Sequence, residues 1–95
     1  MTSTDNESSY PSVRVACEEE RVVADCPAIY RLYELQGSTP QYLMEIVFEG
    51  ERDRAYLGEE YLFAMRIFRA LVYGRVTPCT LRAIVADLRQ DGAIF

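Results

Sequence analysis

Hydrophobic and polar residues alternate along the first half of the chain and follow a longer period in the second half. Alternation with a period of two is typical of strands, because successive side chains of a strand point to opposite faces of its sheet. The pattern predicts strands over residues of about 13–24, 29–36, 41–49 and 54–57. The third strand is the clearest, with Tyr42, Met44, Ile46 and Phe48 on one face and Leu43, Glu45, Val47 and Glu49 on the other.

Short polar segments separate these strands. The predicted turns are residues 25–27, the loop at residues 36–40 and residues 50–53. Connections this short join antiparallel neighbours, so the sequence predicts a meander of three to four strands. In the first strand we expect Val13, Val15 and Cys17 on one face, and the acidic run at residues 18–20 on a solvated edge.

After Gly58 the apolar residues recur with a period of about 3.6, which is typical of amphipathic helices. The pattern predicts helices over about 59–73 and 78–90. Their expected core faces are Tyr61, Ala64, Met65, Phe68, Leu71 and Val72 in the first helix and Leu81, Ile84, Val85 and Leu88 in the second. An antiparallel meander followed by two such helices predicts a two-layer α+β fold, with both helices packed on one face of the sheet.

The ends of both helices have local signals. Glu59 and Glu60 fall in the predicted first turn, where the helix dipole favours negative charge, and Gly74 is the expected end of that helix. Thr77 followed by Pro78 is a typical helix start. We expect a single domain over residues 12–95. Residues 1–11 are polar and acidic, and we expect a disordered tail there.

Composition excludes much known enzyme chemistry. The 95 residues include 15 acidic and 10 basic side chains, giving a formal charge of -5, with no histidine and no lysine. Without these two residue types the chain has no Ser-His-Asp arrangement, no Schiff-base lysine and no phosphate-loop lysine. The sequence indicates no catalytic residue and no cofactor, and we expect a protein that is not an enzyme.

The three cysteines favour a reducing compartment. Cys17, Cys26 and Cys79 have no spacing typical of a metal site, so no metal is expected. Cys17 and Cys26 could pair only if the chain were exported, and the polar start of the chain is unlike a signal peptide. No apolar run approaches the roughly 18 residues of a membrane span. We therefore expect a cytoplasmic protein without membrane contact.

Seven tyrosines and four phenylalanines are many for one small core, so some must line an outer surface. If the helices cover one face of the sheet, the other face carries Leu32 or Leu43 together with Val47. Exposed aromatic residues beside arginines are typical of protein interfaces. We interpret Tyr30, Leu32, Leu43 and Val47 as candidate contacts with a protein partner or with a second copy of the chain.

The second half of the chain is locally basic and offers an alternative. Residues 61–90 resemble a DNA-binding helix-turn-helix, although the connection is longer than the usual turn. In this alternative, Thr80 and Arg82 lie near bases, and Arg66, Arg69 and Arg75 lie near phosphates. The net negative charge opposes nucleic-acid binding. The leading interpretation is therefore a non-enzymatic, protein-binding or self-associating adaptor domain, and the alternative is a transcription-related DNA-binding protein.

Several segments also carry a resemblance to a known family. They are Tyr30-x-Leu32, Tyr42 through Val47, Ala64-x-x-Ile67-Phe68-x-x-Leu71, and Val76-Thr77-Pro78-Cys79-Thr80-Leu81-x-x-Ile84-Val85-x-Asp87-Leu88. Over residues 28–90 the chain resembles a small uncharacterised Firmicutes family, domain-of-unknown-function family 6514. The resemblance implies a short intracellular bacterial protein with a β-rich first half and a closing Val-Thr-Pro helix. It implies no activity, substrate or cofactor, and the acidic tail and missing lysines depart from the family.

Overall fold

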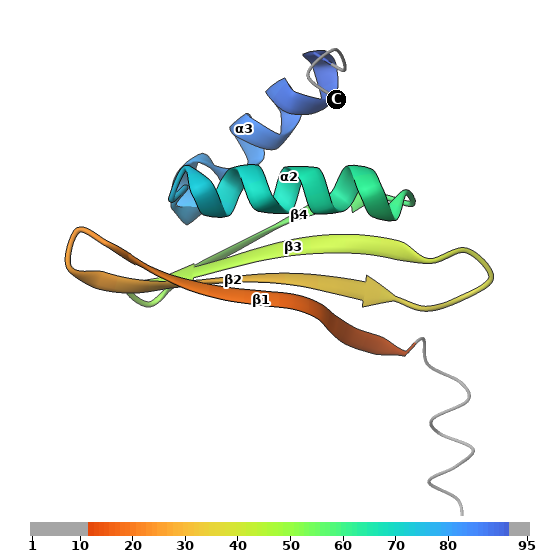
Figure 1. Cartoon of the computed structure of the whole chain (residues 1–95), viewed down its shortest axis with the longest axis horizontal. Coiled ribbons are helices and arrows are strands. Elements are labelled where there is room, and N and C mark those ends of the chain that lie inside the picture. Colours follow the sequence, from red (N-terminus) through yellow and green to blue (C-terminus); the bar gives the residue numbers. More distant parts are fainter. Residues whose placement is uncertain (1–11, 92–95) are drawn as a thin grey trace, which may run out of the picture.

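The computed structural model describes residues 12–91 and has four strands followed by two helices (Figure 1). The elements are β1 (Val13–Val23), β2 (Cys26–Leu35), β3 (Gln41–Phe48), β4 (Glu51–Gly58), α2 (Tyr61–Tyr73) and α3 (Pro78–Asp91). The strands form one antiparallel sheet in the order β1-β2-β3-β4. This confirms the predicted α+β meander. The predictions for residues 1–11 and for the apolar end at residues 93–95 lie outside the described residues.

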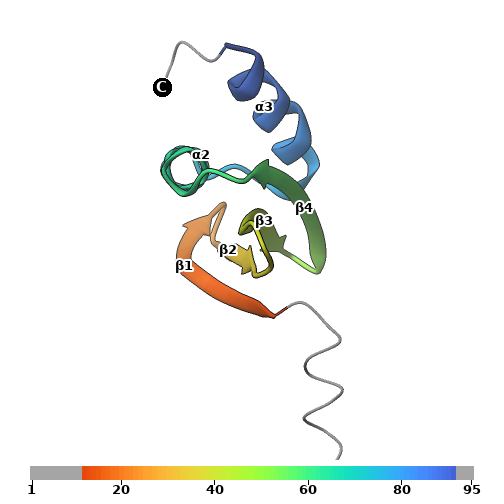
Figure 2. The ribbon, with the colours of Figure 1, turned by 90° about the vertical axis from the view of Figure 1, so that its right-hand side faces the viewer.

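Both helices lie on the same side of the sheet. Helix α2 lies over the sheet and runs roughly along the direction of β2 and β3, and α3 packs mainly against β4 and then projects away from the sheet (Figures 1 and 2). The core between the layers is formed by fully buried side chains of β2, β3, β4, α2 and α3, among them Leu32, Met44, Leu57, Phe68 and Leu81. Burial of this apolar area is the main force that holds the helices on the sheet. We call the opposite side of the sheet, which no described helix covers, the open face.

Tyr30 ties the sheet to the connection between the helices. Its ring is fully buried under the helical layer, and its hydroxyl donates a hydrogen bond of 3.0 Å to the carbonyl oxygen of Val76. A buried hydroxyl needs such a partner, because leaving it unpaired costs free energy. Burial raises the pKa of Tyr30, while the positive charges of Arg75 and Arg21 lower it in part.

A β-bulge changes the predicted faces of β1. The register shifts between Val15, which lies opposite Tyr33, and Cys17, which lies opposite Leu32. The extra residue, Ala16, reverses the alternation of side chains. Val15 therefore points to the open face and Cys17 to the helical side. The prediction that Val13, Val15 and Cys17 share one face was wrong for this reason.

Two turns are tighter than predicted. The β1–β2 turn consists of Ala24 and Asp25, both with positive φ, and the β3–β4 turn consists of Glu49 and Gly50, also with positive φ. Two consecutive left-handed residues form a turn whose twist matches antiparallel strands, so pairing resumes at once. As a result, Cys26 already belongs to β2, and β4 begins at Glu51. The predicted turns at residues 25–27 and 50–53 were placed too late along the chain.

Helix α2 begins at Tyr61, two residues later than predicted, because Glu60 has an extended backbone and is the N-cap residue. The two glutamates therefore lie outside its first turn. Gly74 is the C-cap, as predicted, but the residue with positive φ is Arg75. The amide of Val76 donates to the carbonyl of Leu71, and the amide of Arg75 donates to that of Val72, each at 3.1 Å. This pattern is a Schellman motif with arginine in place of the usual glycine.

The two-residue turns predict stability changes of opposite sign. Ala24→Gly should raise the free energy of unfolding by about 0.5–1 kcal/mol, because glycine adopts positive φ without strain. Gly50→Ala should lower it by about 1 kcal/mol through backbone strain alone, since a Cβ there meets nothing within 4 Å. Urea denaturation measures both. Shifts of the same sign in the two variants would contradict the turn assignment.

Candidate functional site

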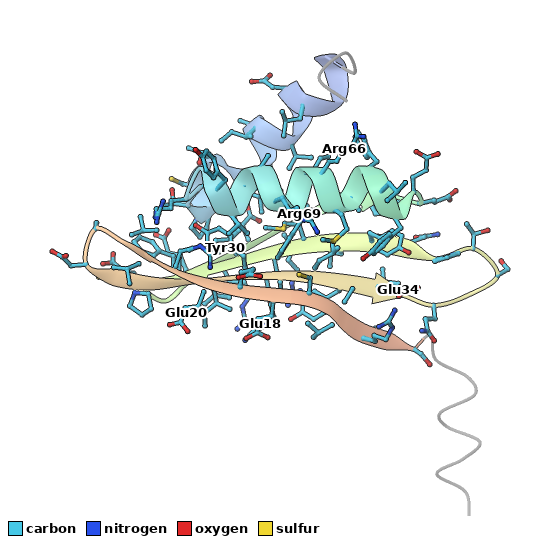
Figure 3. The ribbon with its side chains drawn as sticks, in the orientation of Figure 1. Glu18, Glu20, Tyr30, Glu34, Arg66 and Arg69 are labelled. Atoms are coloured by element: carbon cyan, nitrogen blue, oxygen red, sulfur yellow. The ribbon has the colours of Figure 1, made fainter. Side chains whose placement is uncertain are left out.

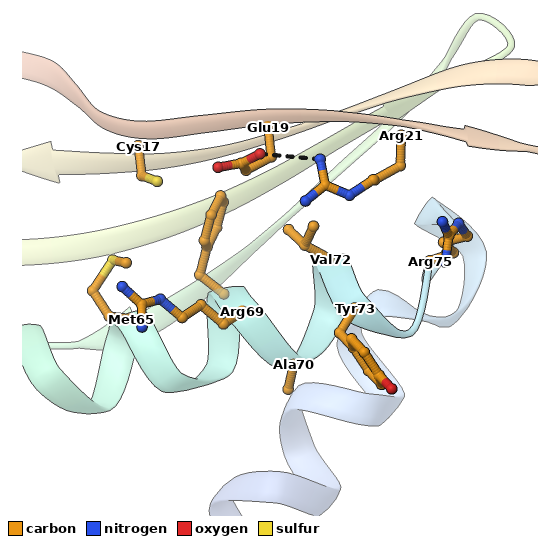
Figure 4. A pocket seen from close by; sticks show the side chains of 10 residues that line it. Cys17, Glu19, Arg21, Met65, Arg69, Ala70, Val72, Tyr73 and Arg75 are labelled. Carbon is orange, nitrogen blue, oxygen red and sulfur yellow. Dashed lines mark hydrogen bonds and ion pairs between the residues drawn. The ribbon is translucent and has the colours of Figure 1, made fainter.

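A groove runs between strand β1 and helix α2 (Figure 4). Its volume is about 740 Å³. We call it the β1 groove, and it is lined by Cys17, Glu19 and Arg21 from β1, by Met65, Phe68, Arg69, Ala70, Val72 and Tyr73 from α2, and by Arg75. Phe68 and Val72 are buried and contribute apolar surface between the charged groups. The groove therefore combines an apolar wall with guanidinium groups.

The outer edge of β1 runs along this groove. Strand β1 is at the end of the sheet and pairs only with β2 within residues 12–91. Val23 and Cys26 close a two-residue hairpin, so the backbone N–H and C=O groups of Val23 point toward β2. Along an antiparallel strand these groups point alternately toward the partner strand and away from it. This places the N–H and C=O groups of Glu18, Glu20 and Val22 on the outer edge. The carbonyl of Glu20 accepts a 2.9 Å hydrogen bond from Arg21 Nη1.

Positive charge exceeds negative charge in the β1 groove. Of the described residues, three guanidinium groups and one carboxylate line it, and this carboxylate, Glu19, pairs with Arg21 at 3.0 Å. The guanidinium groups of Arg69 and Arg75 form no ion pair with any residue whose side chain is described. In a chain with a net charge of -5, this is a local positive site. It suits an anionic group.

The open face is organised around a buried carboxylate. Glu45 is only 1% exposed although no described element covers it, because neighbouring side chains lie over it. The Tyr33 hydroxyl donates to Glu45 Oε1 at 2.9 Å, and Arg31 Nη1 donates to the same oxygen at 3.3 Å. Arg54 Nε donates to Oε2 at 3.0 Å, and Arg52 Nε lies 3.4 Å from that oxygen. We call these five residues the Glu45 network.

Protonation in the Glu45 network follows from these contacts. Burial raises the pKa of Glu45, but the hydrogen bonds from Tyr33, Arg54 and Arg31 outweigh it and hold the pKa below its ordinary value. Burial and the hydrogen bond to this carboxylate raise the pKa of Tyr33. Glu45 is therefore ionised at neutral pH, and its lone pairs are occupied by donors.

The structure divides the predicted interface residues between two environments. Tyr30 and Leu32 are fully buried beneath the helices, because they alternate onto the same side of β2 as Ala28. Neither is available to a partner at the surface. Leu43 and Val47 lie half-buried on the open face, on either side of Glu45 along β3.

The predicted anion contacts are also divided. Arg69 and Arg75 line the β1 groove, whereas Arg66 points away from the sheet (Figure 3). Arg82 pairs with Asp53 at 3.0 Å and donates to the carbonyl of Arg54 at 3.3 Å. The Thr80 hydroxyl donates to the carbonyl of Thr77 at 3.2 Å. The structure thus brings two of the five arginine and threonine candidates together in one site.

The cysteines are free thiols at separate places in the fold. Cys17 lies six positions before Val23, the residue opposite Cys26, so the two are on the order of 20 Å apart along the strands. This is too far for a disulfide in the folded protein. The Cys26 thiol donates to Glu49 Oε2 at 2.8 Å, and this hydrogen bond, with burial and the negative charge, raises the pKa of Cys26.

The described residues hold neither a metal site nor a membrane-spanning helix. Among the described residues, no group of three or more cysteine, aspartate or glutamate side chains is arranged to hold a metal ion. None of the described helices is long and apolar enough to cross a membrane.

No family model, no curated protein and no solved structure matches the chain. The resemblance to family 6514 stays a prediction.

Two features of this arrangement were not predicted from the sequence. The acidic run at residues 18–20 was expected on a solvated edge, yet Glu19 forms one wall of the β1 groove together with Arg21. A signal was present, since β1 carries charged residues on both of its faces where an inner face is usually apolar. Glu45 was placed on the correct face of β3, but its partners depend on the strand register, which the alternation does not determine.

The Glu45 network predicts a pH-dependent loss of stability. Glu45→Gln should lower the free energy of unfolding at pH 7 by about 1–2 kcal/mol, because three guanidinium groups lose their shared carboxylate. A carboxyl group with a lowered pKa stabilises the fold above its unfolded pKa of about 4.3, and this contribution is lost as the pH falls through the folded value. The difference between wild type and variant should therefore be full above about pH 5 and shrink below about pH 4.

Glu18→Gln is the matched control. Glu18 is exposed, and among the described side chains it pairs only with Arg31, at 3.3 Å, so this variant should change stability by less than about 0.5 kcal/mol. Urea denaturation at several pH values gives both comparisons. A difference for Glu45→Gln that did not vary with pH would contradict the assigned ionisation.

Proposed function

We propose that this chain is a non-enzymatic protein-binding domain that takes up an extended segment of a partner beside β1, in the β1 groove. The observation that carries the proposal is the alignment of a free strand edge with a groove along its length. In this binding mode the segment becomes an additional strand, with main-chain hydrogen bonds on one side and side-chain contacts on the other.

The edge of β1 supplies the main-chain part of the binding. Its outward groups belong to alternate residues, so a segment in an extended conformation matches their spacing. The carbonyl of Glu20 now accepts from Arg21, and a segment that pairs with this carbonyl replaces that hydrogen bond. After this exchange Arg21 keeps its ion pair with Glu19, and its N–H group that had bonded to Glu20 becomes available to the incoming segment.

Helix α2 supplies the side-chain part. Phe68 and Val72 are buried at the base of the groove, whereas Met65 is half-buried and Ala70 and Tyr73 are exposed. A segment seated there covers apolar surface that water now reaches, and this contributes to affinity. The charged side chains of the β1 groove then favour segments of complementary charge.

The open face supports a docking role less well. The groups of the Glu45 network are already paired with one another at the centre of that face, between Leu43 and Val47. A partner placed there would remove these charges from water, which costs free energy. It would gain no hydrogen bond in return, because the charged groups are already paired. Self-association through the open face would appear in sedimentation as a dimer that Leu43→Arg abolishes and Glu20→Pro leaves intact.

The salt dependence of binding distinguishes DNA binding by residues 61–90 from protein binding. Arg82 and Thr80 are engaged with β4 and with the start of α3, so a base-reading role would require them to release these contacts. Binding of a random-sequence duplex that weakens steeply with salt would favour this alternative over a protein-binding role.

Strand addition predicts a proline-sensitive interaction. Peptides selected from a displayed library of random linear sequences against the full chain should bind wild type and Glu20→Ala alike. They should bind Glu20→Pro at least about tenfold more weakly, because proline removes an outward N–H without disturbing pairing with β2. Hydrogen exchange should show new protection at the amides of Glu18, Glu20 and Val22.

A second measurement is independent of the fold of the proline variant. N-methylation of alternate peptide amides should abolish binding in one register of methylation and spare it in the other, since only alternate amides face β1. Circular dichroism of Glu20→Pro checks that this variant is folded. Selected peptides that tolerate both methylation patterns and bind Glu20→Pro normally would show that β1 is not the binding edge.

A further inference from the structure

We infer that the partner segment has acidic side chains at alternate positions, facing the β1 groove, and basic side chains at the positions between them. This inference rests on the proposed strand addition and specifies the chemistry of the partner. It follows from the different charges on the two sides of β1.

The two sides of β1 differ in charge. Cys17, Glu19 and Arg21 point toward α2 and line the groove (Figure 4), whereas Glu18 and Glu20 point away from the helices (Figure 3). A strand that pairs with β1 follows the same alternation, so its side chains also divide between these two sides. Directly opposite residues have Cβ atoms about 5 Å apart, close enough for charges to act on one another.

On the groove side, the incoming side chains meet an excess of guanidinium groups. Arg21 is paired with Glu19, but Arg69 and Arg75 have no carboxylate partner among the described side chains. Arg75 is held at the end of the groove by the Schellman motif that closes α2. Carboxylates on this side of the segment would complete ion pairs that the chain itself leaves open.

On the open side, the incoming side chains meet carboxylates. Glu18 is 51% exposed at its side chain and shares Arg31 with Glu45, and Glu20 has no ion-pair partner within the described part of the chain. An acidic residue opposite these groups would be repelled, and a lysine or arginine would be attracted. The segment is therefore acidic on one face and basic on the other.

A second copy of β1 does not fit this pattern. Antiparallel pairing of β1 with itself about Glu19 would bring the acidic run of residues 18–20 against the same run of the other copy, and pairing about Glu20 would still set Glu20 against its own copy. Like charges directly opposite each other destabilise a strand pair. The acidic run thus disfavours edge-to-edge dimers and leaves the edge free for a partner of the alternating type.

Two synthetic peptides of identical composition test the inference. One repeats Glu-Lys over about eight residues, and the other repeats Glu-Glu-Lys-Lys over the same length. The first presents all its carboxylates on one face of a strand, while the second mixes both charges on each face. The alternating peptide should bind the full chain at least about tenfold more tightly at low salt, measured by fluorescence anisotropy.

Variants of arginines on α2 and just after its C-cap assign the charge preference to the β1 groove. The double variant Arg69→Gln/Arg75→Gln should bring the affinity ratio of the two peptides close to one. Arg66→Gln, on the same helix but outside the β1 groove, should leave the ratio unchanged. A synthetic β1 peptide, Val13–Val23, should not bind, and its binding would show that a second copy is the occupant.

The outcomes separate this inference from the proposed function. If both peptides bind equally and Glu20→Pro weakens both, strand addition stands and the charge pattern is wrong. The charge pattern is also wrong if neither synthetic peptide binds while library-selected peptides do. If no peptide from any source binds at β1, the proposed function fails as well.

Discussion

Charged residues on the inner side of β1 determine the layout of this domain. On β2 and β3 the side chains beneath the helices are apolar and fully buried, as in Leu32 and Met44. On the same side of the sheet β1 carries Glu19 and Arg21, opposite the buried Tyr30 and Ala28. Helix α2 packs on β2, β3 and β4, but it cannot close onto β1 without desolvating this ion pair. The helical layer therefore stops short of one strand, and the β1 groove is the space that remains.

The open face of the sheet meets the opposite requirement. A sheet with one uncovered side needs polar groups there, yet the centre of four strands is remote from water. The Glu45 network satisfies both conditions, because long arginine side chains cover the carboxylate and keep their own ends exposed. Glu18, Arg31, Glu45 and Arg54 lie opposite one another across the four strands, with alternating charge. This cross-strand row favours one register over its neighbours, since a shift would place like charges side by side.

Periodicity predicted the fold because the core positions repeat without interruption. The faces of β3, the start of α3 at Pro78 and most of the apolar stripe of α2 follow from local patterns that tertiary contacts reinforce. In that stripe Tyr61 is exposed, contrary to the prediction, and Ile67 is buried. The turns were misplaced because Ala24 and Glu49 adopt positive φ, which alanine and glutamate rarely do. The bulge at Ala16 could not be read from β1 alone, since it appears only as a mismatch with β2. The candidate site was harder still, because it depends on where α2 lies over the sheet.

The two properties of the β1 groove arise at different levels of the structure. The free edge is a consequence of topology, since an open meander of this order leaves the outer side of its first strand unpaired within residues 12–91. The charge pattern is a consequence of individual residues, including Arg75 in a backbone conformation where glycine costs less. A glycine there would relieve strain and remove one guanidinium from the groove. Edge and charge can therefore be altered independently, and affinity that depends on main-chain pairing is separable from selectivity that depends on arginine.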